Sequence, residues 1–411
     1  MLSFSTPLSG LNADSEDLTV ISNNLANLNT VGYKDDNASF EDLFYEQLGT
    51  SGSGNPIQIG VGTQISGVST EFTQGSLQSS GLDTDVAIQG DGFFVLSNGG
   101  IQEYSRAGNF SIAANGNLVA ADGSLVLGNP AVNGVITPSP TPTPISIPTG
   151  LTTPPKATST VGLTLNLNSG TAANGTFSTS ASVYDALGQV HVLTYTFTKT
   201  AANTWTYAIT IPGADVGAAN PVTVSTGTLM FNGNGVLTAP AANVTGIAVN
   251  GFADGAANLT FTWQLYNANT GPLLTQFAGP SATSATQNDG YAAGTLQSFN
   301  IQSNGVIQGV FSNGQTQPLA QITIANFANE QGLVRKGSND LLQSLASGTP
   351  NIATPGTGGL GTLVGGSLEQ SNVDISTEFA NLILAERGFQ ANARVVTTFD
   401  QVIQAAIALS Q

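Results

Sequence analysis

The side chains that carry most enzyme chemistry are scarce in this sequence. It contains no cysteine and one histidine, His191, which removes thiolate catalysis, disulfides and cysteine-based metal sites together. His191 lies in an alternating, strand-like segment, where a lone histidine is more often a surface or packing residue than a catalyst. We therefore expect no catalytic residue, no cofactor and no metal site, and hence not an enzyme.

One acidic group could suggest calcium. Asp83, Asp85 and Asp91 lie close together in the sequence, but a calcium loop needs its third acid two residues after the second and a distal glutamate. Asp91-Gly92 is a turn dipeptide between two short apolar runs. The pattern therefore predicts a turn between strands rather than an ion site.

Length and charge exclude further classes. The chain has 411 residues and a net charge of −17, and only 8% of its residues are charged. This length predicts two or more domains. No basic stripe is present, which disfavours nucleic-acid partners. The sequence contains no run of eighteen apolar residues, so we expect no membrane-spanning helix. The first basic residue is Lys34, so we do not expect a secretory signal peptide.

The two ends of the chain share an apolar repeat that the middle lacks. Residues at a seven-residue spacing, with companions on a second seam, predict helices that pack beside other helices. We predict these helices over 7–29 and 374–409 and interpret them as self-assembly elements. Their seam residues are Leu11, Leu18, Ile21, Leu25 and Leu28, and then Ile375, Phe379, Leu382, Phe389, Val396, Ile403 and Ile407.

Three acidic residues interrupt these seams. Asp14, Glu386 and Asp400 occupy positions where a two-stranded coiled coil would place Leu or Ile. Either they fix the local register, or the helices pack in a larger array in which the seam drifts off one face. The flanking positions are neutral and polar, which favours helices surrounded by copies of themselves. They are Ser22, Asn23, Asn24, Asn27, Asn381, Gln390 and Asn392.

Between the helices the sequence predicts β structure in two bodies. After the N-terminal helix (1–32) we expect an extended, poorly ordered connector (33–70), then a discontinuous β domain (71–145 plus 289–360). A second β domain (146–288) is inserted into it after a proline-rich tract, and a linker and C-terminal helix (361–411) close the chain. Asn-Gly and Asp-Gly pairs mark hairpin turns throughout. The fold class is thus multidomain, with packed terminal helices and two mainly-β domains.

Four segments resemble the bacterial flagellar rod and hook protein family. They are residues 22–34, 85–110, 325–333 and 366–392, and they occur in the family's order over both ends and the middle of the chain. The first carries the most specific signature. It consists of Asn23, Asn24, Leu25, Ala26, Asn27, Gly32 and Tyr33.

This resemblance implies a structural subunit without enzymatic activity. The large insert at 146–288 is similar to the outer domain of the hook branch, whereas rod members lack such an insert. The resemblance implies a curved, hollow homopolymer that acts as a flexible joint outside the cell, exported by the flagellar type III apparatus without a cleaved signal peptide. It also implies contacts with the distal rod protein, the hook cap and the hook–filament junction proteins. A distal rod protein and a secreted β-rich adhesin remain as alternatives.

Overall fold

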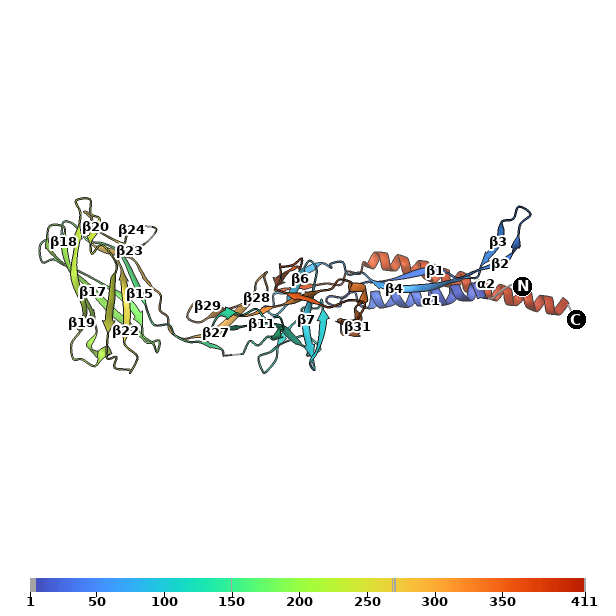
Figure 1. The fold of residues 1–411 in the computed structure, drawn as a ribbon, viewed down its shortest axis with the longest axis horizontal. Coiled ribbons are helices and arrows are strands. Elements are labelled where there is room, and N and C mark those ends of the chain that lie inside the picture. The colour runs from blue at the N-terminus through green and yellow to red at the C-terminus, as the bar shows by residue number, and fades with distance from the viewer. Residues whose placement is uncertain (1–4, 149, 268, 270, 410–411) are drawn as a thin grey trace. The chain divides into compact units, whose positions relative to one another are not determined.

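The computed structural model describes residues 5–148, 150–267, 269 and 271–409, and the chain forms two compact units (Figure 1). Unit 1 comprises Met1–Thr149, Ser298–Gly309 and Gln317–Gln411, and unit 2 comprises Gly150–Gln297 and Val310–Thr316. The middle of the chain therefore forms its own unit between segments of the first. In the described part of the chain, neither helix is long and apolar enough to cross a membrane.

Unit 1 contains the two helices that the apolar repeats predict. They are α1 (Ser5–Ala26) and α2 (Ile375–Leu409). Asp374 caps α2, because its Oδ1 atom accepts the Thr377 amide at 2.9 Å. The first helix ends three residues earlier than expected. Its last turn loosens where the Asn27 side chain donates to the Asn23 carbonyl at 2.9 Å and the Thr30 amide bonds the Asn27 carbonyl.

Residues 33–70 do not form the poorly ordered connector that we expected. Strand β1 (Asp36–Asp42) pairs antiparallel with β4 (Thr63–Thr70), and we call this pair the β1–β4 ribbon. Between them, β2 (Tyr45–Thr50) pairs with β3 (Pro56–Gly60) as a hairpin whose tip contains the Gly-Ser-rich segment. The expectation was wrong because β1 and β4 are distant in sequence, and local patterns do not show such pairing.

The β body of unit 1 surrounds an aromatic core. Phe93, Tyr104 and Phe327 pack edge to face, with ring centroids 4.8–6.1 Å apart. Asn115-Gly116 and Asp122-Gly123 lie in tight turns between paired strands, as predicted. The strands up to the insert are β5 (Leu77–Ser79), β6 (Val86–Gln89), β7 (Phe93–Asn98), β8 (Ile101–Ser105), β9 (Ser111–Ile112), β10 (Leu118–Val119), β11 (Leu125–Val132), β12 (Val135–Ile136) and β13 (Thr143–Pro144).

After the insert, the chain returns to this body and closes it. Strand β34 (Thr362–Gly365) pairs with β6, and β35 (Ser367–Glu369) pairs with β5, directly before α2. The other returning strands are β27 (Gly294–Ile301), β28 (Val306–Phe311), β29 (Thr316–Ile322), β30 (Ile324–Asn326), β31 (Val334–Gly337), β32 (Asp340–Leu342) and β33 (Asn351–Ala353), with the short helix η2 (Glu330–Gly332).

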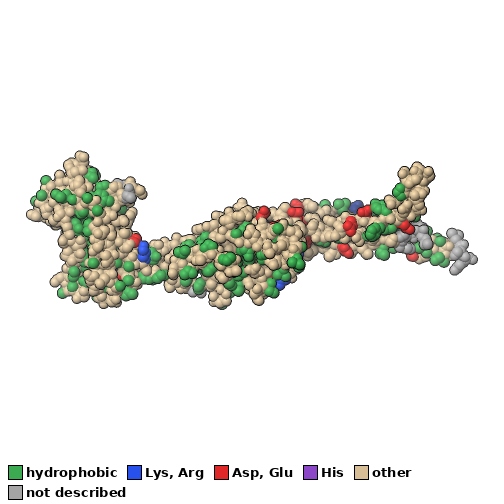
Figure 2. Space-filling view, viewed as in Figure 1, with side chains coloured by type: hydrophobic (Ala, Val, Ile, Leu, Met, Phe, Trp, Pro, Cys, Tyr) green, Lys and Arg blue, Asp and Glu red, His purple; other side chains and the backbone are tan. Residues whose placement is uncertain are grey.

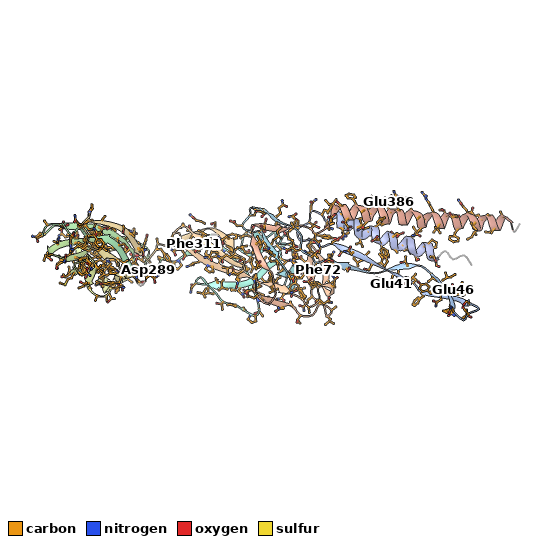
Figure 3. The ribbon with its side chains drawn as sticks, turned by 90° about the horizontal axis from the view of Figure 1, so that it is seen from above. Glu41, Glu46, Phe72, Asp289, Phe311 and Glu386 are labelled. Atoms are coloured by element: carbon orange, nitrogen blue, oxygen red, sulfur yellow. The ribbon has the colours of Figure 1, made fainter. Side chains whose placement is uncertain are left out.

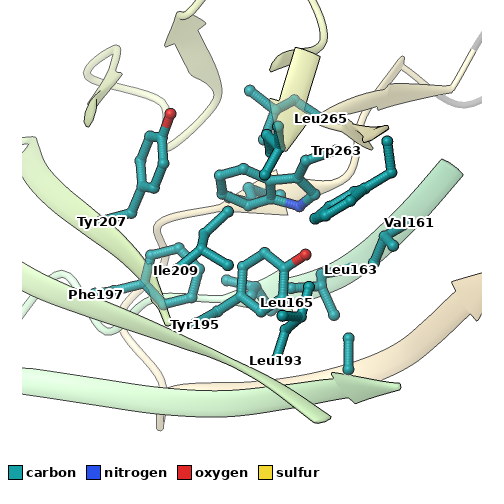
Figure 4. Close-up of a cluster of buried hydrophobic side chains, with 14 of the residues drawn as sticks. Val161, Leu163, Leu165, Leu193, Tyr195, Phe197, Tyr207, Ile209, Trp263 and Leu265 are labelled. Atoms are coloured by element: carbon teal, nitrogen blue, oxygen red, sulfur yellow. The ribbon is translucent and has the colours of Figure 1, made fainter. Parts of the chain in front are cut away.

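Unit 2 is built from two sheets that share one core (Figure 4). One sheet has the order β16-β17-β18-β19-β20, and the other has β21-β22-β15-β25 with β26 on β15. Strand β18 alternates half-buried threonines with buried Trp205 and Tyr207, the period-two pattern of a strand with one face in a core. Both tryptophans of the chain, Trp205 and Trp263, are fully buried in this core.

The bounds of the unit 2 elements complete the fold. They are β14 (Thr152–Thr153), β15 (Thr160–Asn166), β16 (Thr176–Tyr184), β17 (Val190–Ala201), β18 (Thr204–Ile211), η1 (Gly213–Val216), β19 (Val222–Phe231), β20 (Leu237–Ala239), β21 (Val244–Val249), β22 (Leu259–Gln264), β23 (Tyr266–Asn267), β24 (Gly271–Pro272), β25 (Leu274–Thr275) and β26 (Ala282–Asn288).

Asp289 fastens the last strand of unit 2 to its first segment (Figure 3). Its Oδ1 atom accepts the amides of Ser159 and Thr160, both at 2.8 Å, and its Oδ2 atom accepts the Ser159 hydroxyl at 2.6 Å and Lys156 Nζ at 3.0 Å. The boundary expected at 288/289 therefore falls inside unit 2. Burial alone would raise the pKa of Asp289, but these hydrogen bonds hold it well below its ordinary value.

We predict that Asp289→Asn destabilises unit 2 by about 1–2 kcal/mol at pH 7. The amide nitrogen would replace Oδ2 and weaken the bonds from the Ser159 hydroxyl and Lys156 Nζ. A depressed pKa gives stability that is present above the unfolded-state pKa and is lost as pH falls through the folded-state pKa. The difference from the parent should therefore shrink at pH 3. Urea unfolding followed by tryptophan fluorescence reports unit 2 selectively. Lys156→Met, which keeps both amide bonds, should cost less; an equal loss for Asp289→Asn at both pH values would contradict the assignment.

Candidate assembly surface

The two helices of unit 1 pack antiparallel through small and polar residues. At one end of the pair Asn24 Nδ2 lies 3.4 Å from Glu378 Oε2, and at the other Asn392 donates to Asp14 Oδ2 at 2.9 Å. Gly10 faces Asn392 so closely that a Cβ atom there would lie 2.6 Å from the Asn392 amide nitrogen. The helices therefore approach each other because their facing positions lack bulk.

The predicted apolar seam is not the seam of this helix pair. Of its residues only Ile21 is buried, and Leu11, Leu18, Leu25, Leu28, Leu382 and Val396 are half-buried. The remaining ones are exposed, namely Ile375, Phe379, Phe389, Ile403 and Ile407. The facing positions Gly10, Ala13 and Asp17 follow the same three-and-four spacing on a neighbouring stripe. The small residues Gly10 and Ala13 on this stripe are the sequence signal for the seam that the structure shows.

The acidic and neutral polar residues divide between the two sides of the pair. Asp14 and Asn392 lie in the intrachain seam, and Asn24 is buried there, so these asparagines do not flank the outside as we expected. Glu386, labelled in Figure 3, and Asp400 are instead exposed on α2. They accept hydrogen bonds from Gln390 and Gln404, respectively.

Large apolar side chains cover the outside of α2. Phe379, Ile383 and Leu384 are each at least half exposed, and Val395 and Val402 line a hollow together with Phe399. All residues from 401 to 408 are exposed. A helix that exposes this much large apolar surface normally buries it against a partner. We call the exposed apolar residues of α2 the outer face; they are Ile375, Phe379, Ile383, Leu384, Phe389, Val395, Val402, Ile403 and Ile407.

The family-signature residues form the joint between α1 and the β1–β4 ribbon. Asn24 Oδ1 accepts both the Tyr33 hydroxyl and the Asp36 amide at 3.1 Å, and Asn24 Nδ2 donates to the Asp36 carbonyl at 2.8 Å. Asn23 donates to the Tyr33 hydroxyl at 3.2 Å. Asn24 thus satisfies both backbone groups of Asp36, whose partner position on β4 is Thr70, and an asparagine is needed there because it both donates and accepts.

Other signature residues shape the turn after this joint. Gly32 has φ +68°, and a Cβ atom there would lie 2.7 Å from the Ala107 nitrogen and the Arg106 carbonyl carbon, so only glycine fits. Asn27 loosens the helix end as described above. Leu25 is half-buried and Ala26 is exposed, and neither contributes a polar contact to the joint.

A buried ionic cluster fixes the joint to the β body. Glu369 is fully buried; its Oε1 atom lies 2.6 Å from Lys34 Nζ and accepts the Gly75 amide at 2.9 Å, and its Oε2 atom lies 3.4 Å from Arg106. Burial lowers the pKa of Lys34, and Glu369 opposes that shift. Sequence reasoning missed this cluster because Lys34 and Glu369 are 335 positions apart.

Acidic groups crowd the joint near the start of α2. On the face drawn in Figure 2, acidic side chains gather over the part of unit 1 that holds the helices and the β1–β4 ribbon. Burial, followed by repulsion from Glu378, raises the pKa of Asp35 to about 6. Burial and the neighbouring Asp14 and Glu378 also raise the pKa of Asp17. Arg335 compensates only Asp36, through two bonds of 2.7 and 2.9 Å.

We predict that acidification from pH 7.5 to pH 5 stabilises the helix pair. A raised folded-state pKa gives stability that is present below the unfolded-state value, near 3.9, and is lost as pH rises through about 6. Asp35→Asn should raise the melting midpoint of the helical circular-dichroism signal at pH 7.5 and reduce its pH response. Asp42→Asn, an exposed position on β1, is the control. If the melting midpoint of Asp35→Asn responded to pH as the parent's does, burial and repulsion at Asp35 would not be the cause of the pH dependence.

Comparison with protein-family models matches four segments of the chain. Residues 4–34 match the model described as flagella basal body rod protein, and 364–409 match flagellar basal body rod FlgEFG protein C-terminal. Residues 87–162 match flagellar hook protein FlgE/F/G D1 domain, and 152–291 match flagellar basal body protein FlaE D2 domain. The segments at the ends are therefore those shared by rod and hook proteins.

Comparison with whole proteins is more specific. The chain is 38% identical to flagellar hook protein FlgE of Salmonella typhimurium, over 99% of this chain and 100% of that protein. It is 36% identical to flagellar hook protein FlgE of Treponema pallidum over the full length of both. The crystal structure of Helicobacter pylori flagellar hook protein FlgE2 has the same fold, with a TM-score of 0.52 and 17% identity over 70% of this chain and 98% of that one. The chain belongs to the flagellar hook protein family and is a structural subunit of the hook.

Proposed function

We propose that this subunit polymerises through its terminal helices into a curved, hollow tube that acts as a flexible joint. The observation that carries the proposal is the outer face of α2, which leaves Phe379, Ile383 and Leu384 in water in the isolated chain. Burying a side chain of this size is worth about 1.5–3 kcal/mol. Several such residues per copy would therefore make association with neighbouring helices strongly favourable in free energy.

The intrachain seam supports the same assignment of roles. Small and polar residues hold α1 against α2 and keep the bulky apolar residues on the outside. In this proposal the pair forms one element of an inner helical layer, and each copy supplies outer-face residues to the next. The interrupted seams then reflect a helical array rather than a two-stranded coiled coil.

Unit 2 supports the flexible character of the proposed tube. Its only charged residues from 150 to 290 are Lys156, Asp185, Lys199, Asp215, Asp254 and Asp289. Asp185 and Lys199 are buried, and Lys156 pairs with Asp289 within the unit. Contacts between neighbouring copies of unit 2 would therefore contain few ion pairs. Neutral surfaces can slide past one another without breaking strong directional contacts, as a joint that bends while it rotates requires.

The remaining parts of the proposal rest on family membership. We propose that the chain acts outside the cell after export by the flagellar type III apparatus, and that it has no enzymatic activity. We propose the distal rod protein, the hook cap and the hook–filament junction proteins as further partners. The alternative of a distal rod protein predicts a straight, rigid polymer, whereas the full-length similarity to hook proteins favours a curved one.

We predict that Phe379→Ser abolishes tube formation while leaving a folded monomer, because the lost apolar contact recurs in every copy of the polymer. Phe277→Ser in unit 2 is a matched control, since Phe379 is 51% exposed and Phe277 is 52% exposed. Electron microscopy of each purified full-length protein under polymerising conditions separates tube, straight rod and monomer. Tryptophan fluorescence verifies that unit 2 remains folded.

Deletion of 372–411 should have the same effect as Phe379→Ser. Normal tubes from either altered protein would refute assembly through α2. Straight tubes from the parent chain would contradict the proposed curved form of the polymer. Loss of tubes in Phe277→Ser alone would indicate that unit 2, rather than α2, makes the main contact between copies.

A further inference from the structure

His191 is a buried packing residue, which is one of the two roles that its sequence context suggested, and it also lies between carboxylates. It lies on β17, is 4% exposed, and stacks on Phe252 with ring centroids 4.5 Å apart. Both ring nitrogens face carboxylates. Nε2 lies 3.1 Å from Asp185 Oδ2, and Nδ1 lies 3.1 Å from Asp215 Oδ2.

A third carboxylate completes this group. One oxygen of Asp254, one oxygen of Asp185 and one ring nitrogen of His191 all lie within 4.8 Å of one another. Asp185 is fully buried, whereas Asp254 is exposed. The group is therefore rigid on one side and open to solvent on the other. A small ion could reach it from that open side.

Backbone hydrogen bonds orient the two carboxylates. The amides of Leu187 and Gln189 donate to Asp185 Oδ1 at 2.8 and 2.9 Å, which leaves Oδ2 directed at the histidine. The Ala256 amide donates to Asp254 Oδ1 at 2.9 Å. Neither Asp185, Asp215 nor Asp254 forms an ion pair with Lys or Arg among the described residues. No Lys or Arg side chain therefore compensates the negative charge of these three carboxylates among the described residues.

We propose that Asp185, His191 and Asp254 form a binding site for a divalent transition metal ion, with Zn²⁺ as the best-matched ion. One imidazole nitrogen with two carboxylate oxygens is a donor set that suits Zn²⁺, and it leaves a further position for water. A histidine that binds a metal usually presents its other ring nitrogen to a carboxylate, which fixes the ring. The Asp215 carboxylate lies 3.1 Å from Nδ1, close enough to take that role once a bound ion orients the ring.

The proposed ion would join three segments of unit 2 that are separate in the sequence. Asp185 follows β16, His191 lies on β17, and Asp254 lies in the loop after β21. Asp215 belongs to η1, and its backbone carbonyl accepts the Ala253 amide at 2.9 Å. Bound metal should therefore hold the η1 turn and the loop at 250–256 against the sheet edge, and it should stabilise unit 2 against unfolding.

The test uses the full-length chain after chelator treatment. Titration with ZnCl₂ is followed by calorimetry, and unit 2 unfolding is followed by the fluorescence of Trp205 and Trp263. We expect one saturable site and a higher unfolding midpoint with Zn²⁺. Asp254→Asn keeps the oxygen that accepts the Ala256 amide and should weaken binding by about tenfold or more, and Asp215→Asn should weaken it by about 10–100-fold. Asp83→Asn, an exposed acid in unit 1, should bind as the parent does.

Co²⁺ absorption gives a second readout, because visible bands that indicate nitrogen coordination should appear in the parent and be lost in Asp254→Asn. Three outcomes would overturn the proposal. They are absence of saturable Zn²⁺ binding, equal binding by the parent and Asp254→Asn, and equal stabilisation by Mg²⁺. In each case the role of His191 would be limited to packing and to its contacts with the neighbouring carboxylates. None of these outcomes depends on whether the chain forms tubes.

Discussion

The buried carboxylate of Glu369 connects both ends of the chain to the β body of unit 1. It binds Lys34, which follows α1, and Arg106, which belongs to the β body, while its own backbone directly precedes α2. A charge this deep is stable only when it is paired, and removal of one partner from such a group typically costs about 3–5 kcal/mol. The positions of α1, the β1–β4 ribbon and α2 therefore all depend on this one group.

The seam between α1 and α2 explains why the helices need further partners. Gly10, Ala13 and Ala385 bury little apolar area, and the hydrogen bond from Asn392 to Asp14 contributes only about 1–3 kcal/mol. Carboxylates at the joint oppose the pairing. Intrachain contacts thus align the two helices without satisfying their apolar surface. The residues that leave the α1–α2 pair only marginally stable in the single chain also leave its apolar surface available for association with other copies.

The sequence predicted those features that depend on local pattern. Both helices and the turns at Asn115-Gly116 and Asp122-Gly123 follow from residues a few positions apart. The features it missed join distant residues: β1 with β4, Lys34 with Glu369, and His191 with Asp215. The apolar heptad residues lie mostly outside the intrachain seam. Heptad patterns report which side of a helix avoids water, but they do not distinguish a partner within the chain from one outside it.

The basic residues show how charge is distributed between folding and assembly. Of the eight Lys and Arg residues, Lys34, Arg106, Arg335 and Lys336 bind carboxylates within unit 1, and Lys156 binds one within unit 2. Lys199 is buried beside Trp205. The other two, Arg387 and Arg394, lie on α2 and form no ion pair among the described residues. Because nearly every cation already stabilises the fold of its own chain, association between copies must rely chiefly on apolar area and neutral hydrogen bonds. Such contacts are less directional than ion pairs, and a surface built from them can change register at low energetic cost while remaining buried.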